Sequence, residues 1–391
     1  MKVIASKRVQ SIGGYAFAEI DKKVAEAKAR GVDVIDFGVG DPTDPTPKFI
    51  RNACKKGVDN RASSGYPSYI GSLEYRSAIA TWVANRFGIV LDPKTEICST
   101  IGAKEGVFHF PFGFVNPGDY VLCPTPGYPP YSRGTLFAGG IPWFYPLLER
   151  NNFFPDFKSI PEEIAKKSKI LWLNYPNSPT GECATREIYE QAIEFAQRYN
   201  IIIASDECYS EIYFGEKPIS ILELAKEGAV VFQSFSKPYK MTGYRVGWAM
   251  GDSRIIDVFK KVKTNFDSGT PTFIQDAAIV AMEELTHVEC AREEYRKRRD
   301  VIVEALVSVG LKRCQPEGTF YIWQKVPKGM TSVKFAEVLL EQCEIVVTPG
   351  EAISEIVADE TNPGRDFVRF ALVPSLERIK EAAERIRNLK F

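Results

Sequence analysis

Short apolar runs alternate with helical patterns throughout residues 95–251 of this chain. The segment between two of these runs, residues 185–200, places apolar side chains on one helical face and begins at Thr185, a residue type that caps helix N-termini. Strands that alternate with helices form a mostly parallel sheet with helices on both faces. We therefore predict an α/β fold whose strands are the runs "EICST", "YVLCP", "PWFYPL", "ILWLN", "IIIASDE", "VVFQSFS" and "RVGWAMG".

The pattern changes on either side of this region. Beyond about residue 280 there are long charged helical segments and then two strand-like runs, "GTFYIWQKV" and "FVRFALVPS". The N-terminal segment is short and ends in the proline-rich run "GDPTDPTPKF", so we expect it to pack with this later unit. The sequence thus predicts a large domain over residues 48–280 and a smaller α+β domain formed by residues 1–47 plus 281–391.

The charge of the chain is balanced, with 50 basic and 50 acidic side chains in 391 residues. Such a balance provides no basic field, so we expect neither nucleic acid nor a membrane as a partner. No apolar run reaches the roughly 20 residues that span a bilayer, and the N-terminus lacks the apolar core of a secretory signal. We expect a cytoplasmic protein in which the run "EEYRKRRD" forms a solvent-exposed helix face.

The number and spacing of the cysteines and histidines restrict the metal sites, disulfides and catalytic groups that the chain can form. The 8 cysteines show no Cys-x-x-Cys spacing, which argues against a zinc ribbon or a disulfide framework, so we expect reduced thiols and no metal. Only 2 histidines occur, and we expect His109, in an apolar run, to be a core residue. An enzyme built on this chain would therefore use other side chains to move protons.

Parallel sheets bind ligands at the carboxyl ends of their strands, so the residues that follow each run are candidates for a site. After "EICST", a glycine turn opens a helix, and the backbone amides of Gly102, Ala103 and Lys104 would suit a phosphate, although many α/β turns look the same. After "YVLCP", Tyr128 stands on a proline-rich turn. Its ring is either a stacking surface for a planar ligand or a turn residue packed on the surface.

Two further strand ends carry polar side chains. Asn177 and Ser178 follow "ILWLN", in a turn where both could donate or accept hydrogen bonds. Asp206 and Tyr209 come at the end of the β-branched run "IIIASDE". A carboxylate in such a position is buried and needs a cationic or donor partner, unless it serves only as a helix N-cap.

Lys237 follows "VVFQSFS" and, taken alone, is either a surface charge or a nucleophile. Ser234, Ser236, Arg245 and the amides at 102–104 together suit a phosphate, and they leave the lysine amine in excess. Lysine attacks carbonyl groups once nearby cations and desolvation lower its pKa. A phosphate, a basic ring nitrogen for Asp206, a flat ring for Tyr128 and an aldehyde for Lys237 are all present in pyridoxal 5'-phosphate.

The motifs "NYPNSPTG", "SDECYSEI" and "SFSKPYKMTGYRVGW" resemble those of the fold type I pyridoxal-phosphate aminotransferases, the aspartate aminotransferase superfamily. The similarity extends from "FGVGDPTDPTP" to "FVRFALVPS", which is nearly the whole chain. It implies the fold type I architecture, a homodimer with shared active sites, and a ping-pong transfer of an α-amino group between an amino acid and a 2-oxo acid.

Residue roles follow from this resemblance. Lys237 would bind the cofactor aldehyde and move the substrate proton, Asp206 would hold the ring nitrogen, and Tyr209 would bond the ring oxygen. Tyr128 would stack on the ring, and the phosphate would be held by Ala103, Lys104, Ser234, Ser236 and Arg245, with Tyr66 reaching the phosphate of the neighbouring subunit. Arg369 would clamp the substrate carboxylate beside the backbone of Gly40.

One position departs from the family pattern. The asparagine that normally precedes "PTG" and bonds the ring oxygen is replaced by Ser178, with Asn177 before it. The resemblance therefore implies that either Ser178 substitutes with a shorter reach or Asn177 rotates into the site.

Several stretches most resemble the LL-diaminopimelate aminotransferase family, among them "FVNPGDYVLCPTPGYPPY" and "VKTNFDSGTP". This similarity implies substrate contacts from Tyr15, Lys104 and Asn265, and 2-oxoglutarate as the acceptor, in lysine biosynthesis. Aminotransferases for aspartate, alanine, aromatic amino acids or N-succinyl-diaminopimelate share the same motifs, and a β-lyase on the same scaffold is a further alternative. A regulator that borrowed the fold is disfavoured, because a full set of cofactor residues is present and no basic arm accompanies it.

Overall fold

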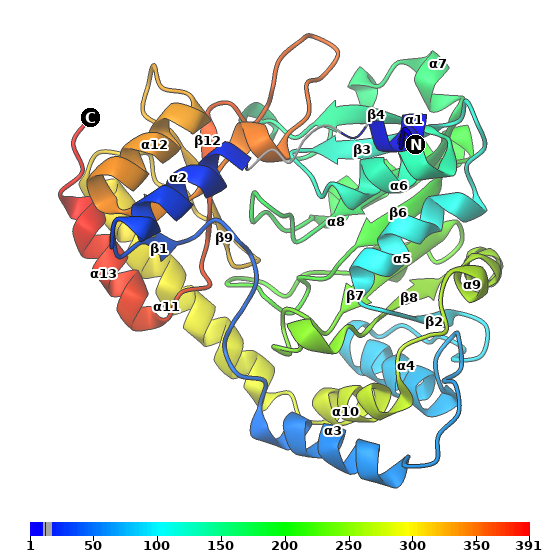
Figure 1. Ribbon diagram of the computed structural model, residues 1–391. Coiled ribbons are helices and arrows are strands. Elements are labelled where there is room, and N and C mark those ends of the chain that lie inside the picture. The colour runs from blue at the N-terminus through cyan, green and yellow to red at the C-terminus, as the bar shows by residue number, and fades with distance from the viewer. Residues whose placement is uncertain (11, 13–17) are drawn as a thin grey trace.

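A seven-stranded sheet forms the centre of the protein, in a computed structural model that describes residues 1–10, 12 and 18–391 (Figure 1). The strand order is β2-β8-β7-β6-β5-β3-β4. The pairs that join β3 to β7 are parallel, and only β8 runs antiparallel to its neighbours β7 and β2, so the predicted mostly parallel sheet is confirmed. Its strands are β2 (Ile97–Thr100), β3 (Tyr120–Thr125), β4 (Ile141–Pro146), β5 (Ser168–Asn174), β6 (Ile202–Asp206), β7 (Ala229–Ser234) and β8 (Gly247–Gly251).

Helices bury both faces of this sheet. In β5, Leu171 and Leu173 belong to a core shared with α4, α8 and α10, whereas Ile170 and Trp172 belong to a core shared with α5, α6 and α9. Side chains of a strand alternate between faces, so a strand that is apolar at every position is buried on both sides. The helices are α3 (Lys48–Asn60), α4 (Leu73–Phe87), α5 (Ala103–His109), α6 (Pro130–Ala138), α7 (Glu162–Ala165), α8 (Arg186–Tyr199), α9 (Ser253–Phe266) and α10 (Thr272–Glu283).

A second, smaller unit has its own core. Its sheet has the antiparallel order β11-β12-β9, and β1 pairs in parallel with β10, so residues 35–36 lie against the C-terminal part of the chain. The division at residues 48 and 280 stays a prediction. The elements are α2 (Ala18–Ala29), α11 (Thr286–Ser308), α12 (Ser332–Cys343), α13 (Leu376–Arg387), β1 (Ile35–Asp36), β9 (Tyr321–Lys325), β10 (Ile345–Val346), β11 (Thr348–Pro349) and β12 (Phe367–Ala371). The short helix α1 (Lys7–Gln10) lies instead beside the large unit, where Arg8 Nη1 donates to the carbonyl of Phe137 in α6 at 3.2 Å (Figure 1).

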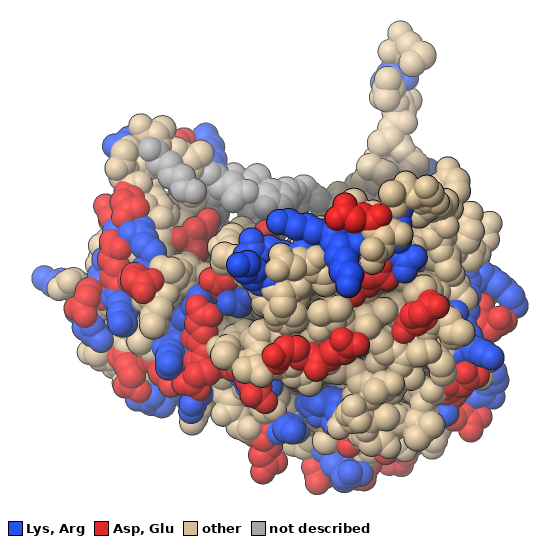
Figure 2. All heavy atoms as spheres, turned by 90° about the horizontal axis from the view of Figure 1, so that it is seen from below, with Lys and Arg blue, Asp and Glu red and all other residues tan. Residues whose placement is uncertain are grey.

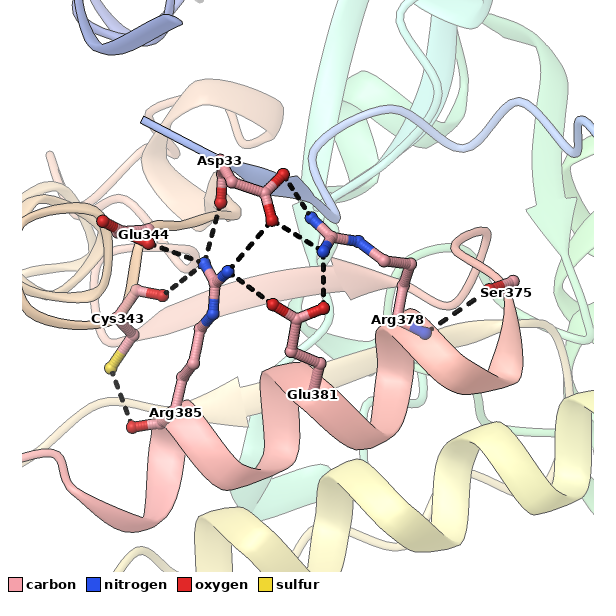
Figure 3. Close-up of polar contacts among 7 residues, drawn as sticks. All are labelled: Asp33, Cys343, Glu344, Ser375, Arg378, Glu381 and Arg385. Carbon is pink, nitrogen blue, oxygen red and sulfur yellow. Dashed lines mark hydrogen bonds and ion pairs between the residues drawn. The ribbon is translucent and has the colours of Figure 1, made fainter. Parts of the chain in front are cut away.

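An ionic network fixes the residues just before β1 against α13 (Figure 3). Arg378 pairs with both carboxylate oxygens of Asp33, at 2.7 and 2.8 Å, and Arg385 lies 3.2 Å from the same carboxylate. Glu381 accepts hydrogen bonds from both arginines, and Arg385 also reaches Glu344 at 2.9 Å. The hydrogen bond from Arg378 lowers the pKa of Asp33. The network holds the start of β1, and therefore the glycine segment that follows it, beside the second sheet.

The run "EEYRKRRD" in α11 does not form the fully solvent-exposed face that we predicted. Arg298 is only 1% exposed, and its Nη1 donates to the carbonyls of Leu372 and Val373, each at 3.1 Å. The second terminal nitrogen of Arg298, Nη2, pairs with Asp44 at 3.2 Å and with Glu294. Because a guanidinium carries five donors in a planar fork, it can satisfy several acceptors at once in a buried position.

His109 also differs from the prediction, since it is half-buried and polar in its contacts. Its Nδ1 lies 3.0 Å from a carboxylate oxygen of Glu105, and its ring stacks on Phe266 with centroids 4.1 Å apart.

On the face shown in Figure 2, acidic and basic side chains are interspersed. None of the described helices has the length and apolar character that would carry it across a membrane.

Candidate active site

A cavity of about 320 Å³ lies at the carboxyl ends of β5, β6 and β7. Parts of the second unit close it, because Gly40 and residues of β9 and β12 also line it. This is the place where a doubly covered parallel sheet is expected to bind a ligand. The predicted residues that line it are Gly40, Ala103, Lys104, Tyr128, Ser178, Asp206, Tyr209, Ser234, Ser236, Lys237, Arg245 and Arg369.

Lys237 faces the cavity three residues beyond β7. Its Nζ donates to the carbonyl oxygen of Gly40 at 2.7 Å and lies 5.6 Å from the ring centroid of Phe320. The amine therefore contacts a neutral acceptor and an aromatic ring, and it forms no ion pair within the described part of the chain. An amine held in this way, with no carboxylate beside it, is suited to attack a carbonyl carbon.

Asp206, the last residue of β6, is 6% exposed. Its carboxylate accepts a hydrogen bond from the hydroxyl of Tyr131 at 2.7 Å and one from the backbone N–H of Cys208 at 3.2 Å. Burial raises the pKa of Asp206, since no cation pairs with it in the described part of the chain. The residues after it form a turn, so Asp206 is not a helix N-cap. A ligand with a cationic N–H would compensate the buried charge.

Tyr209 and Tyr321 meet in the same cavity, one from each unit. Their hydroxyl oxygens are 3.2 Å apart, and the side chains are 9% and 4% exposed, respectively. Burial, followed by the proximity of Tyr321, raises the pKa of Tyr209 well above its ordinary value. Tyr209 therefore stays protonated and available as a hydrogen-bond donor.

Arg369, in the middle of β12, points toward the same cavity. One of its terminal nitrogens donates to the carbonyl of Gly38 at 2.9 Å and to the hydroxyl of Thr348 at 3.3 Å. Its Nε is buried and has no hydrogen-bond partner in the part of the chain that the structure describes. A buried donor left unpaired in this way is an opening for a ligand carboxylate, which guanidinium binds through two parallel hydrogen bonds.

The opposite end of the cavity is built for an anion. Arg245, in the left-handed region at φ 54°, donates to the carbonyl of Thr242 at 2.8 Å and to the hydroxyl of Ser236 at 3.4 Å. Its guanidinium covers the start of α5 so closely that a Cβ on Gly102 would lie 2.4 Å from it. Serine hydroxyls, an arginine and the amide end of a helix fit a phosphate monoester.

Some predicted residues lie away from the cavity. The side chain of Asn177 bonds to Asn174 and Thr180 within its own turn, which leaves Ser178 as the member of the pair that lines the cavity. Tyr66 is 86% exposed. Asn265 is exposed, and its amide caps the carbonyl of Lys261 at 2.8 Å. Tyr15 lies outside the described residues.

Other residues of the cavity were not predicted. Asn174 is the last residue of β5, and its amide donates to the carbonyl of Asp206 at 2.9 Å, so the rule of inspecting strand ends would have found it. Tyr131 stands three residues after Tyr128, one helical turn away. Tyr321 and Asp41 come from the second unit, and no pattern in the sequence places them beside the central sheet.

A larger cavity, of about 610 Å³, lies between α4, α10 and α11. Its two arginines are already engaged: Arg86 Nε is 2.6 Å from a carboxylate oxygen of Glu211, and Arg292 lies 3.9 Å from the other oxygen of Glu211 and 3.9 Å from the ring centroid of Tyr213. Among the residues described, this cavity therefore has no buried arginine donor without a partner. The smaller cavity is therefore the candidate active site.

The chain belongs to the family described as Aminotransferase class I and II, whose sequence model matches residues 32–386. It is an aminotransferase. It is 50% identical to the LL-diaminopimelate aminotransferase of Aquifex aeolicus and 47% identical to that of Halothermothrix orenii, over 99% and 98% of both chains, respectively. Among solved structures, it is similar to a substrate-bound BacF of Bacillus subtilis (TM-score 0.90, 32% identity, 100% and 98% covered) and to a Thermus thermophilus aspartate aminotransferase (TM-score 0.90, 28% identity, 100% of each chain covered).

Proposed function

We propose that this aminotransferase binds pyridoxal 5'-phosphate in the candidate active site and moves the amino group of LL-diaminopimelate to 2-oxoglutarate. The observation that carries the cofactor is that one cavity joins Lys237, the buried and uncompensated Asp206, and the cradle at Arg245. The substrate is supported by the two full-length relatives named LL-diaminopimelate aminotransferase. The structures of the more distant relatives carry other names, including a probable N-succinyldiaminopimelate aminotransferase at 30% identity.

Each group of the cofactor has a partner in the cavity. Arg245, Ser234, Ser236 and the amides of Ala103 and Lys104 would hold the phosphate, and Tyr128 would stack on the ring. When bound, pyridoxal phosphate supplies an electron sink for the bond that breaks at the substrate α-carbon. Asp206 holds the proton on the ring nitrogen, Tyr209 and Ser178 bond the ring oxygen, and the Nζ of Lys237 moves the proton of the α-carbon.

The charged side chains of the cavity that the cofactor would not contact fit a substrate that carries a carboxylate and an ammonium group at each end. Arg369 takes the α-carboxylate next to the reacting carbon, through its free Nε. With Arg245 assigned to the phosphate, Lys104 and Asp41 are the remaining exposed ionic side chains of the cavity that have no ion pair among the described residues. One cation and one anion at the entrance complement the distal carboxylate and ammonium of diaminopimelate, and the lysine alone serves the second carboxylate of 2-oxoglutarate.

A homodimer with shared sites, in the cytoplasm, is part of this proposal. Tyr66 and Asn265 are exposed and away from the cavity of their own chain, which is consistent with a role in the site of a partner. Mixing inactive Tyr66→Ala and Lys237→Ala variants tests it, since a hybrid dimer would contain one site with both residues intact. We expect partial recovery of activity; two separate sites per dimer would give none.

A panel of amino donors tests the substrate. With 2-oxoglutarate as the acceptor, LL-diaminopimelate should give glutamate with the highest kcat/KM, ahead of aspartate, alanine, aromatic amino acids and N-succinyl-diaminopimelate. The variant Asp41→Asn should lose activity with diaminopimelate but keep the half-reaction with glutamate, which is followed without an acceptor by the visible absorption of the bound cofactor. A preference for any other donor would contradict the proposed substrate and leave the reaction class intact.

A further inference from the structure

We propose that Tyr321 is a positioning residue that couples the substrate clamp at Arg369 to the cofactor contact at Tyr209. The inference rests on the proposed function, and it assigns separate tasks to the ring and to the hydroxyl of Tyr321. Tyr321 is the first residue of β9, and in the register of the sheet it pairs with Ala371 of β12, two residues from Arg369.

The ring of Tyr321 supports the clamp. The guanidinium carbon of Arg369 lies 4.6 Å from the ring centroid, which is within range of a cation–π interaction. Together with the hydrogen bond to Gly38 at 2.9 Å, this contact fixes the plane of the guanidinium and leaves Nε free. A fork that is held before the ligand arrives loses less side-chain entropy on binding a carboxylate.

The hydroxyl of Tyr321 supports the cofactor contact. It lies 3.2 Å from the hydroxyl of Tyr209, and either oxygen can be the donor of this hydrogen bond. Once Tyr209 donates its only proton to the ring oxygen of the cofactor, it can only accept from Tyr321. The two tyrosines then form a donor chain, Tyr321 to Tyr209 to the ring oxygen, and each hydrogen bond strengthens the next.

Gly40 adds a third contact at the same side chain. A Cβ at Gly40 would lie 2.0 Å from the Tyr321 hydroxyl oxygen, so glycine is required for the backbone to approach so closely. The carbonyl of this glycine accepts the hydrogen bond of Lys237 at 2.7 Å. Arg369, Tyr209 and Gly40 therefore all pack against Tyr321, although they come from widely separated parts of the chain.

Two variants separate the two tasks. Tyr321→Phe removes the hydroxyl and keeps the ring, whereas Tyr321→Leu removes both. The ring oxygen of the cofactor stabilises a proton on the neighbouring nitrogen that Lys237 supplies. A hydrogen bond from Tyr209 to this oxygen weakens that stabilisation. Weakening that hydrogen bond therefore raises the pH midpoint of the visible absorption of the bound cofactor, and we expect a rise of about half a unit in both variants.

The ring is tested by carboxylate binding. Succinate, which binds without reacting, should bind to the Tyr321→Phe holoenzyme as it does to the wild type, and about tenfold more weakly to Tyr321→Leu. The KM for 2-oxoglutarate should follow the same order. This readout requires no turnover, so it stays informative even if the wild type fails to transaminate any donor, which is the result that would refute the proposed function.

Tyr295→Phe is the matched control. Tyr295 is a buried tyrosine of the same core, its ring centroid lies 5.2 Å from that of Phe320, and its hydroxyl has no partner among the residues described. Removing this hydroxyl should change neither the midpoint nor succinate binding. The proposal is overturned if Tyr321→Phe keeps the wild-type midpoint, if Tyr295→Phe shifts it equally, or if Tyr321→Leu binds succinate like the wild type.

Discussion

The two walls of the active site are built in different ways. The sheet wall, made of Asp206, Ser234, Ser236 and Arg245, comes from a short stretch of chain at the ends of neighbouring strands. The clamp wall, made of Gly40, Tyr321 and Arg369, is assembled from distant segments: the hydrogen bond from Arg369 to Gly38 spans 331 residues. The first wall depends on one sheet, whereas the second depends on the two ends of the chain meeting.

This difference indicates a division of labour. The side chains of the sheet wall are held in place within the protein, because its arginine, serines and aspartate have hydrogen-bond partners there. The clamp wall keeps an unpaired donor, the Nε of Arg369. A cofactor that stays bound through many turnovers suits the first arrangement, and substrates that exchange in every cycle suit the second. The variants below act on one wall at a time.

Lys237 lies between the walls, and its loss should have the largest effect. The variant Lys237→Ala should lower kcat by about 10⁴-fold or more, since in the proposed reaction both the covalent attachment and the proton transfer would depend on Nζ. Turnover and the visible absorption of the bound cofactor are the measurements. Turnover like that of the wild type would remove Lys237 from the chemistry, whereas circular dichroism like that of the wild type would show that the variant is folded.

The clamp wall is broken most directly by Arg369→Lys. An ammonium cannot form two parallel hydrogen bonds or maintain the stacking on Tyr321, so kcat/KM should fall by about 10²- to 10³-fold. The affinity for the cofactor should stay unchanged, because the sheet wall is intact. A loss of cofactor affinity equal to the loss of kcat/KM would show that the walls are not independent.

The sheet wall rests on a buried ionic cluster around Lys263, which is 0% exposed. Its Nζ lies 3.1 Å from Glu105 and 2.8 Å from Asp267, and Glu105 also accepts the backbone N–H of Ile101 at the start of the phosphate cradle. Lys263→Met would leave two carboxylates without their cation, so the free energy of unfolding should fall by about 3 kcal/mol.

Denaturant unfolding measures this change, and cofactor titration should show weaker binding in the same variant. Lys261→Met, in an exposed ion pair of the same helix, is the control and should have little effect. If Lys263→Met were as stable as the control, the cluster would not support the sheet wall.

Asp206 gives the sheet wall a pH dependence. Burial raises the pKa of Asp206, because it disfavours the charged form. As the pH falls, it should therefore take up a proton at a higher pH than an ordinary aspartate, and cofactor affinity should weaken from that point downward. Asp206→Asn should bind the cofactor about tenfold more weakly at neutral pH. When the apo-enzyme of this variant is titrated with cofactor, the affinity should no longer fall at low pH. If the fall persists in Asp206→Asn, it is caused by another group.

The sheet wall was largely predictable from the sequence, because the carboxyl ends of parallel strands meet at one edge. That rule predicts the positions of Asp206, Ser234 and Lys237 from the sequence alone. It could not decide between Asn177 and Ser178, because the choice depends on hydrogen bonds within the turn. Asn174 is the last residue of β5, and the rule, applied to the residues that follow the run "ILWLN", does not select Asn174.

The clamp wall was predictable only through family resemblance. Arg369 was found in that way, but Tyr321 belongs to a strand that reads as ordinary apolar β-structure. Its role depends on contacts with Tyr209 and Gly40, which no local pattern encodes. Arg298 shows the same limit, since a charged helical run gives no indication that one of its members is buried against carbonyl groups.

A half-reaction tests the central claim most directly. Holoenzyme mixed with LL-diaminopimelate in the absence of an acceptor should lose its visible absorption at one equivalent per subunit, and the absorption should return when 2-oxoglutarate is added, with one equivalent of glutamate formed. That result would establish transfer of an amino group through the site described. Release of ammonia with no glutamate formed, or a response to aspartate but not to LL-diaminopimelate, would contradict it.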